Sequence, residues 1–275
     1  MTTWRLLPDD GERDPRTNLA REEAVARRVA ADPGAPAPVL RLWRNDPAVV
    51  IGRFQLGAAE VDLRAAAALG APVLRRFSGG GTVWHDPGNL NVSVVARPED
   101  ALLASDPQLR RLPGLYRLVL EPLAVAARAL GVARARAGER DLVIDQPAGG
   151  TRKLGGVAAW IGGRALLVHA TLLVAADLES LARACAGPGA PGDPRWERTR
   201  SRRAEVTSIA RELAVLGRPV PSAAAVDLAV AAAFGAGLAT SAWTADELAA
   251  AARLLADRYG DPAWHADPAP PADPA

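Results

Sequence analysis

Residue types suited to catalysis and ligand binding gather in two short segments of the chain. The first runs from residue 75 to residue 91 and reads RRFSGGGTVWHDPGNLN. Its three consecutive glycines remove every side chain from a predicted strand-to-strand turn, so that a ligand can lie against the bare backbone. The N–H groups of such a turn can hold an anion, and the arginine before it offers a bidentate grip on a carboxylate or phosphate. Taken alone, the glycines also fit an ordinary hairpin turn beside a solvated arginine.

The glycine segment differs from the common nucleotide-binding motifs. No Gly-Lys-Ser or Gly-Lys-Thr follows the glycines, so they do not form a Walker loop. Their spacing is not that of a dinucleotide fingerprint, and no helix is predicted to open directly after them. Both of these large classes of nucleotide-binding protein are therefore excluded.

The second segment, residues 152–173, contains Lys153, the only lysine among 33 basic residues. The chain is rich in alanine, arginine, glycine and proline, and in such a composition a solvated lysine is readily replaced by arginine. A lysine that remains is a candidate for chemistry that needs a compact point charge with three donors. His169 lies in an apolar strand of the same segment, where a histidine is more often a hydrogen-bonded core residue than a catalyst.

Composition excludes several other classes of site and partner. Three histidines and one cysteine argue against a zinc site, and the single Cys185 excludes a disulfide within the chain. The lone cysteine fits a reducing compartment, and we expect a cytoplasmic protein. No run of 18 apolar residues predicts a membrane span, and the N-terminus does not resemble a signal peptide. The net charge of +2 and the lack of a basic block with interleaved aromatic residues argue against a nucleic-acid partner.

The elements that must position these segments are helices and short strands of one mixed α/β (α+β) domain. We expect a mostly antiparallel, hairpin-connected sheet flanked by helices over residues 1–265, a flexible loop at 186–194, and a disordered Pro/Ala-rich tail at 266–275. A capping box at Thr244 and Glu247 marks one helix start, and Gly162 and Gly163 mark a tight hairpin. The predicted helices are 17–30, 61–69, 115–130, 222–236 and 244–259, and the predicted strands are 39–43, 48–54, 73–77, 82–84, 90–96, 141–145, 157–161 and 165–174.

Together these segments resemble the lipoate-protein ligase A family, whose fold is shared with biotin-protein ligase. The matching blocks follow one another in order across residues 17–265. They are Asn18-Leu19-Ala20 with Glu22-Glu23, residues 42–55 (LWRNDPAVVIGRFQ), the Arg-Arg-x-Ser-Gly-Gly-Gly segment, Arg140-Asp141-Leu142 before Lys153, Arg202 with Val206-Thr207-Ser208-Ile209, and residues 259–264 (YGDPAW).

The resemblance implies a biotin/lipoate ligase-like domain that uses ATP and Mg²⁺ to convert lipoate into lipoyl-adenylate. The lipoyl group would then pass to a lysine of a carrier, either the lipoyl domain of a 2-oxoacid dehydrogenase E2 subunit or the glycine-cleavage H protein. A preorganised cation between carboxylate and phosphate oxygens stabilises both steps, and the resemblance gives this catalytic role to Lys153. Other roles follow in the same way: Arg76 and the backbone of Ser78, Gly79, Gly80 and Gly81 border the acyl and phosphate groups, Val83, His85, Ala158 and His169 belong to the acyl or adenylate pocket, Asn89 holds the phosphate, and Asp141 orients Lys153 or helps to hold Mg²⁺.

The chain departs from the family pattern at two places. His169-Ala170-Thr171 replaces the usual His-Gly-Thr, and Lys153-Leu154-Gly155-Gly156 replaces Lys-x-Ser-Gly. Both changes are expected to touch the pocket and to alter the preference for the acyl chain. Larger family members also carry a C-terminal accessory domain, which this sequence does not include, so we expect that adenylation needs a separate accessory chain.

Three other functions remain open from the sequence. An ATP-independent octanoyl or lipoyl transferase would use Cys185 as a thioester nucleophile, whereas a small buried cysteine in the core is the alternative role for that residue. A ligase for another acid, such as biotin or octanoate, would share the same motifs. A non-catalytic acyl-carrier-binding protein on the same scaffold is the third alternative, and the retained lysine argues against it.

Overall fold

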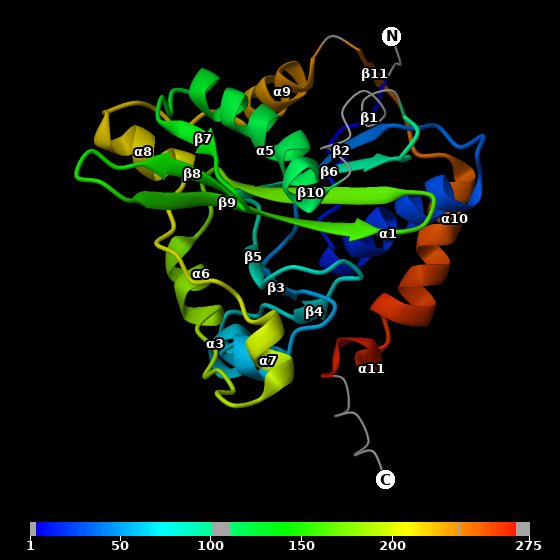
Figure 1. Cartoon of the computed structure of the whole chain (residues 1–275), viewed down its shortest axis with the longest axis horizontal. Coiled ribbons are helices and arrows are strands. Elements are labelled where there is room, and N and C mark those ends of the chain that lie inside the picture. Colours follow the sequence, from blue (N-terminus) through cyan, green and yellow to red (C-terminus); the bar gives the residue numbers. More distant parts are fainter. Residues whose placement is uncertain (1–3, 101–110, 236, 268–275) are drawn as a thin grey trace.

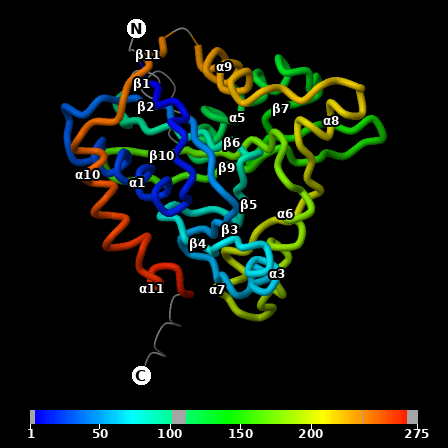
Figure 2. Tube along the Cα trace, turned by 180° about the vertical axis from the view of Figure 1, so that it is seen from behind, coloured from blue at the N-terminus to red at the C-terminus, as the bar shows by residue number. Residues whose placement is uncertain are grey.

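The structure, a computed structural model, describes residues 4–100, 111–235 and 237–267. Two β-sheets of different size form its framework, and helices pack around both, as Figures 1 and 2 show from opposite sides. Most neighbouring strands are antiparallel, so the predicted mixed α/β class with a mostly antiparallel sheet is confirmed.

The larger sheet carries one half of the candidate site. Its strands are β1 (Trp4–Leu7), β2 (Val39–Trp43), β6 (Asn89–Ala96), β7 (Ala135–Ala137), β8 (Asp141–Asp145), β9 (Thr151–Ile161), β10 (Leu166–Leu173) and β11 (Leu238–Thr240). They lie in the order β11-β1-β2-β6-β10-β9-β8-β7, and only the pairs β1–β2 and β1–β11 among these described strands are parallel. Side chains alternate between the two faces of a strand. On β10, Val168 and Ala170 therefore join one core, while Leu167 and His169 face the opposite side.

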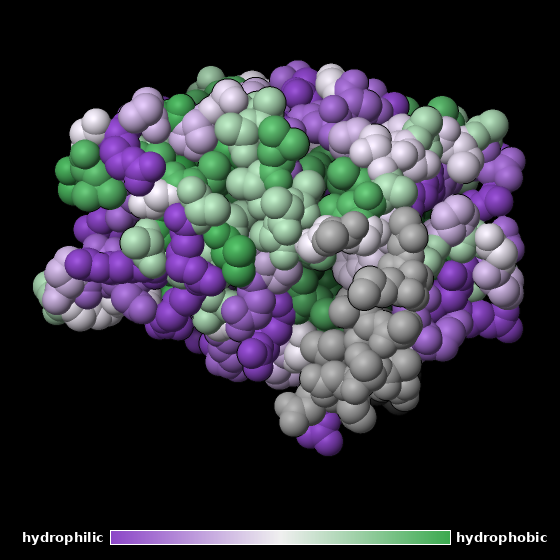
Figure 3. All heavy atoms as spheres, turned by 90° about the horizontal axis from the view of Figure 1, so that it is seen from above, coloured by the Kyte–Doolittle hydropathy of each residue, from purple (hydrophilic) through white to green (hydrophobic). Residues whose placement is uncertain are grey.

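Helices cover both faces of this sheet. Helices α5 (Leu112–Ala129) and α9 (Ala223–Phe234) pack together over the face to which Val168 belongs. On the opposite face, α1 (Pro15–Ala31) contributes Val25 and Val29 to the core and packs against α10 (Ala245–Leu254). The outer surface over α5 and α9 mixes apolar and polar side chains (Figure 3). Val125 of α5 and Leu228 of α9 are exposed apolar residues.

A small sheet lies beside the larger one and carries the glycine segment. Its strands β3 (Ala48–Ile51), β4 (Val73–Arg75) and β5 (Val83–His85) lie in the order β4-β3-β5. Short helices lie near it in Figure 1, and residues of α3 and α6 share its apolar core with Val49 and Ile51. The remaining helical elements are α2 (Gly57–Glu60), α3 (Leu63–Ala68), α6 (Leu178–Ala184), α7 (Pro194–Thr199), α8 (Ile209–Val215), a π-helical turn η2 (Leu255–Tyr259) and α11 (Pro262–His265).

The hairpins predicted between residues 73 and 96 are wrong. Strands β4 and β5 both pair with β3, so the glycine segment crosses from one edge of the small sheet to the other. Strand β5 belongs to the small sheet and β6 to the larger one. Sequential strands are neighbours only about two-thirds of the time, and a local pattern of strands and turns cannot identify the exceptions. The hairpin at Gly162 and Gly163 is confirmed, because it joins the antiparallel strands β9 and β10.

Polar side chains cap several helices, and the starts of α1, α3 and α5 differ from the predicted ones. Helix α1 begins at Pro15, before the predicted start at residue 17, because the Asp14 carboxylate accepts the Thr17 N–H at 2.9 Å. The predicted helix 61–69 is α3, which Asp62 caps at Leu63. The capping box of Thr244 and Glu247 is confirmed.

The predicted disordered tail falls mostly on residues 268–275, which lie outside the described residues. Its second residue, Asp267, is described and pairs with Arg75 at 3.0 Å. Among the described residues, no helix is long and apolar enough to cross a membrane.

Candidate functional site

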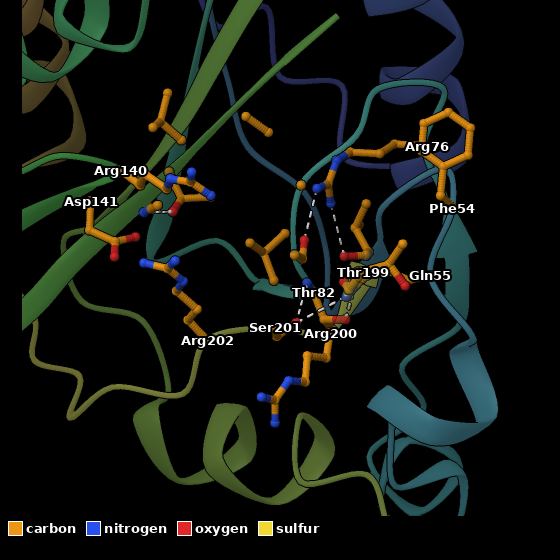
Figure 4. Close-up of a pocket in the computed structure, with 18 of the residues that line it drawn as sticks. Phe54, Gln55, Arg76, Thr82, Arg140, Asp141, Thr199, Arg200, Ser201 and Arg202 are labelled. Atoms are coloured by element: carbon orange, nitrogen blue, oxygen red, sulfur yellow. Dashed lines mark hydrogen bonds between the residues drawn. The ribbon is translucent and has the colours of Figure 1, made fainter. Parts of the chain in front are cut away.

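A cavity of about 1220 Å³ lies between the two sheets and the segment 187–203. Strands β9 and β10 form one wall, and β3, β5 and the glycine segment form another. In Figure 4, Arg140, Asp141 and Arg202 lie together on one side of this cavity, with Phe54 and Arg76 on the opposite side. Ligand pockets commonly measure about 300–1,000 Å³, so this space can hold two small molecules or one large one.

Lys153 lies on β9 with its charge directed into the cavity. Its Nζ lies 2.6 Å from Asp141 Oδ1 on the neighbouring strand β8, and both side chains are partly exposed. The backbone of Lys153 also pairs with the segment that follows the arginine-rich loop, since its N–H donates to Glu205 and its carbonyl accepts from Thr207. A side-chain carbon at Gly156 would lie 3.1 Å from Lys153 Nζ, so the glycine leaves room for the lysine. The predicted partnership between Lys153 and Asp141 agrees with this geometry.

Arg76 organises the glycine segment from beneath. Its guanidinium donates to the carbonyls of Val50, Gly79 and Gly81 and to the Ser78 hydroxyl, at distances of 2.6 to 3.2 Å. Burial lowers the pKa of Arg76 to about 10, which still leaves the group charged near neutral pH. Its hydrogen bonds go to carbonyl oxygens and one hydroxyl rather than to a carboxylate, and Glu22 acts on it through charge.

Gly80 requires a backbone conformation that other residues rarely adopt. Its φ is +89°, and a side-chain carbon there would lie 2.7 Å from Ala158 Cβ. Gly80 and Gly81 line the cavity, but Ser78 and Gly79 do not. Of the segment predicted to border the ligand, the second half therefore lines the cavity and the first half lies behind it.

Glu22, His169 and Ser78 form a hydrogen-bonded line at the buried side of the cavity. The His169 ring lies 2.9 Å from Glu22 through Nδ1 and 2.9 Å from the Ser78 hydroxyl through Nε2. Glu22 Oε1 also accepts the Ser93 hydroxyl at 2.6 Å. Burial alone would raise the pKa of the Glu22 carboxyl, but His169 and the hydrogen bonds lower it below its usual value. The carboxylate is therefore ionised, and His169 Nδ1 carries a proton.

His85 is held in one tautomer by a chain of buried amides. Asn18 donates to the Asn45 carbonyl, and the Asn45 amide lies 2.9 Å from His85 Nδ1. Burial, with a smaller effect of Arg76, lowers the pKa of His85 to about 3, so the ring is neutral. Because Asn45 donates to Nδ1, the single ring proton lies on Nε2. No described side chain accepts that proton, so Nε2–H can donate to a ligand.

The segment 187–203 closes the remaining side of the cavity, and none of its residues was predicted to belong to the site. Ser201 accepts the backbone N–H of Thr82 at 2.8 Å and the side-chain amide of Gln55 at 3.1 Å, which docks the segment on the glycine turn. The signal available in the sequence was the density of arginines just before the Val206 block. The exposed arginines of this segment that line the cavity are Arg198, Arg200, Arg202 and Arg203.

Two of the sequence expectations change with the geometry. Asn89 is fully buried, donates to Asn91 at 3.2 Å and does not line the cavity, whereas Asn91 does. A side-chain carbon at Gly155 would lie 1.9 Å from the carbonyl oxygen of Thr171, so close strand packing requires glycine there. Gly155 does not line the cavity, which leaves Ala170 as the departure that touches it.

Cys185 lies away from the cavity at the end of α6. Burial, with a smaller effect of Glu60, raises the pKa of its thiol to about 12. The thiolate that a nucleophile requires is therefore scarce near neutral pH. Cys185 packs beside the apolar core of the small sheet, in agreement with a structural role.

The residues present would fit a magnesium ion that the protein holds only in part. No cluster of three metal-binding side chains occurs in the described ranges 4–100, 111–235 and 237–267. Mg²⁺ commonly takes one or two carboxylates and completes its octahedron with water and substrate phosphates. Asp141 is partly exposed at the cavity and has one oxygen beyond the one that faces Lys153, so it can supply one such ligand.

Comparison with known proteins places this geometry in a family. Residues 14–235 match the family described as the lipoyl protein ligase A/B catalytic domain. The chain is 34% identical over 212 residues to lipoate-protein ligase A subunit 1 of Thermoplasma acidophilum, a match that covers 74% of this chain and 76% of that protein.

Two solved structures are similar over nearly their whole length. One is a bipartite lipoate-protein ligase with its E2 lipoyl domain from Thermoplasma acidophilum, with 28% identity, a TM-score of 0.73 and 98% of each chain covered. The other is a lipoate-protein ligase A bound with ATP, with 27% identity, a TM-score of 0.73, and 97% of this chain and 99% of that chain covered. The match over most of its length shows that the chain belongs to the lipoyl protein ligase A/B catalytic domain family.

Proposed function

We propose that this chain is the catalytic subunit of an ATP-dependent lipoate-protein ligase. It activates lipoate as lipoyl-adenylate and transfers the lipoyl group to a lysine of a carrier domain. The observation that carries the proposal is a cavity that runs from the partly exposed charges of Lys153 and Asp141 to a wall of buried residues, among them Leu19 and Val50. Such a cavity suits an acid whose apolar chain is enclosed while its carboxyl group meets the phosphates.

The two chemical steps place charge where this chain has cations. In the first step a lipoate oxygen attacks the α-phosphorus of ATP, the bond to the leaving pyrophosphate breaks, and negative charge gathers on both groups. In the second step the carrier amine attacks the acyl carbon and AMP leaves. We assign Lys153 to stabilise this charge in both steps, and Arg76 to hold the glycine turn and add a fixed positive charge beneath it. Mg²⁺, held with the help of Asp141, would neutralise phosphate charge.

The nucleotide is assigned to the side of the cavity that the segment 187–203 closes. Gly80, Gly81 and Thr82 present backbone there, and exposed arginines of the segment lie nearby. Of these, Arg202 faces the cavity beside Asp141 in Figure 4. The relative with ATP bound supports a nucleotide in this family.

The expected partners are a lipoyl carrier domain and a second, accessory chain. The relative named as a subunit and the bipartite ligase with its E2 lipoyl domain support both. We propose an E2 lipoyl domain as the acceptor, and a glycine-cleavage H protein as an alternative acceptor.

A test of the proposal mixes this chain with lipoate, ATP, Mg²⁺ and a lipoyl domain, with and without a candidate accessory chain. Mass spectrometry should show one lipoyl addition to the lipoyl domain, absent when ATP is omitted or the acceptor lysine is replaced by arginine. Addition from octanoyl carrier protein without ATP would support a transferase instead.

A further inference from the structure

The side chain of Gln55 is a buried junction in the wall of the cavity (Figure 4). Gln55 is only 1% exposed. Its side-chain oxygen accepts the Gly52 N–H at 2.9 Å and the Thr82 hydroxyl at 3.0 Å. Its side-chain nitrogen donates to the Thr199 carbonyl at 3.0 Å and to the Ser201 hydroxyl oxygen at 3.1 Å. All four hydrogen-bonding positions of the amide are therefore used.

The backbone partners determine which way this amide faces. The N–H of Gly52 can only donate and the carbonyl of Thr199 can only accept, so the amide oxygen lies toward the first and the NH₂ group toward the second. A carboxylate of the same shape would offer no donor to Thr199, and an apolar side chain would bond to none of the four partners. A neutral amide therefore suits both sides of the junction at once.

The two sides of the junction belong to two separate walls of the cavity. A side-chain carbon at Gly52 would lie 2.0 Å from the carbonyl oxygen of Gly80, so the loop that carries Gln55 packs directly against the glycine turn. On the other side, Ser201 stands between Arg200 and Arg202, which are exposed and line the cavity. Gln55 therefore holds two cationic side chains close to the bare backbone of the turn.

Glu60 anchors the segment 187–203 independently of Gln55. Its buried carboxylate accepts the Trp196 side-chain N–H at 2.9 Å and the Ser201 backbone N–H at 3.1 Å. Glu60 belongs to α2 and does not line the cavity. Loss of the Gln55 amide should therefore free the segment from the glycine turn and leave it attached to α2.

We propose that Gln55 is a positioning residue for the nucleotide, which holds the segment 187–203 at a fixed distance from the glycine turn. The proposed function assigns the phosphates to the space between these two parts, and this inference rests on that assignment. Groups that are already ordered bind an anion more tightly, because they lose little freedom on binding. Gln55 therefore affects the affinity for ATP, whereas the acyl chain of lipoate lies at the buried end of the cavity.

The decisive variant is Gln55→Met, which keeps an unbranched side chain of similar size, adds no charge and removes all four hydrogen bonds. Calorimetry should show the affinity for ATP with Mg²⁺ falling about tenfold, as the loss of buried hydrogen bonds allows. The affinity for lipoate should stay within about twofold of the wild-type value. Without any ligand, trypsin should cleave after the exposed arginines of the segment 187–203 about tenfold faster than in the wild-type protein.

Gln146→Met is the matched control. Gln146 does not line the cavity, and its side chain donates to the Ile144 carbonyl at 3.4 Å. Its affinities for ATP and lipoate and its cleavage rate should equal those of the wild-type protein.

A second variant, Gln55→Glu, carries the test if Gln55→Met does not fold. The introduced carboxylate has no donor for the Thr199 carbonyl, whereas its protonated form regains one. Burial raises the pKa of such a carboxyl group. Cleavage of the segment should therefore be faster than in the wild-type protein at about pH 8 and should approach the wild-type rate at about pH 6.

The outcomes separate this inference from the function on which it rests. Wild-type ATP affinity and cleavage rate in a folded Gln55→Met protein would overturn the inference, as would equal losses of affinity for ATP and for lipoate. A Gln55→Glu protein cleaved at the wild-type rate at both pH values would also overturn it. A wild-type protein that binds no ATP, with or without lipoate and a candidate accessory chain, would defeat the proposed function instead. The cleavage rates would then still decide whether Gln55 holds the segment.

Discussion

At the scale of single residues, Lys153 and Asp141 show how a surface cation is given a fixed place. Exposed lysines are usually mobile, and an exposed ion pair contributes little to stability. Lys153 is instead anchored by backbone pairing on both sides, and Gly156 leaves room for its side chain. The resulting fixed charge is suited to stabilising a transition state, for which preorganisation matters more than strength of pairing.

Replacement of Lys153 by arginine should therefore disable the protein without unfolding it. Lys153→Arg keeps the charge but puts a wider planar group over Gly156, and we expect acyl transfer to fall by about 100-fold or more. Arg152→Lys is the matched control: Arg152 pairs with Glu205 and does not line the cavity, so activity should stay near the wild-type rate. The rate of carrier lipoylation is measured for both variants and for the wild-type protein, and circular dichroism checks that each variant is folded. A Lys153→Arg protein within a few-fold of wild type would remove Lys153 from its catalytic role.

The buried His85 predicts a loss of stability in acid. The pKa of His85 in the folded protein is about 3, below the usual 6.5. At a pH between these values the unfolded chain therefore binds a proton at this residue that the folded chain does not bind. The stabilisation is present above pH 6.5 and is lost as the pH falls toward 3. Between pH 6.5 and pH 5 the loss amounts to about 2 kcal/mol from this residue. Urea unfolding at these two pH values measures the fall in the free energy of unfolding. In His85→Gln this fall should be smaller than in the wild-type protein by about that amount, and an equal fall in both proteins would contradict the prediction.

Cys185 distinguishes the two reaction types. A thioester mechanism cannot operate without its sulfur, whereas an adenylate mechanism stores the acyl group on AMP. With its thiol pKa near 12 and its place outside the cavity, Cys185 should be dispensable. We expect Cys185→Ala to keep most of the transfer activity. The check is mass spectrometry of the intact protein after incubation with octanoyl carrier protein. An acyl adduct that is present in the wild-type protein and absent in Cys185→Ala would contradict the prediction.

At the scale of elements, the glycine segment shows which parts of the site can be predicted from sequence. Three glycines and a preceding arginine indicated a backbone-lined turn, and Gly80, Gly81 and Arg76 do line the cavity. The partners of Arg76 are carbonyls of its own segment and of β3, which spacing along the chain does not reveal. The site residues that were not predicted reach the site through long-range contacts. Ser201, for example, accepts a hydrogen bond from the turn although it lies far from the turn in the sequence.

The positions of the strands along the chain were predicted more reliably than the pairing between strands. Alternation of apolar residues follows from the geometry of one strand, so β2, β8 and the hairpin of β9 and β10 could be predicted locally. The division into two sheets depends on which strands pair across the fold, and β3 inserted between β4 and β5 left no local signal. Asn89 illustrates the same limit, because the family resemblance implied a binding role for it while its side chain is buried and hydrogen-bonded to Asn91.

The two neighbouring glycines of the turn should respond differently to a methyl group. Gly80→Ala meets a positive φ and Ala158, so the free energy of unfolding should fall by about 1–2 kcal/mol and lipoate affinity should fall with it. Gly79→Ala finds its nearest atom at 4.0 Å and should change stability by less than about 0.5 kcal/mol. Urea unfolding and calorimetry with lipoate measure both quantities. Equal effects of the two substitutions would show that the turn adapts, and that Gly80 is not required by its backbone.

At the scale of the whole molecule, the site exists only where separate parts meet. The larger sheet supplies Lys153 and His169, the small sheet supplies His85, α1 supplies Glu22, and the segment 187–203 covers the opening. The arrangement explains why motifs spread over most of the chain converge on one cavity. It also leaves the charged side of the cavity at the surface, open to the carrier and accessory chain that we propose as partners.

The measurement that tests the central claim most directly is isotope exchange between pyrophosphate and ATP. Adenylation is reversible, so a chain that forms lipoyl-adenylate must incorporate labelled pyrophosphate into ATP when lipoate and Mg²⁺ are present. We predict exchange that depends on lipoate, occurs with a candidate accessory chain if not with this chain alone, and falls by about 100-fold or more in Lys153→Arg. Lipoylation of the carrier without any lipoate-dependent exchange, under the same conditions and with the same accessory chain, would contradict the account.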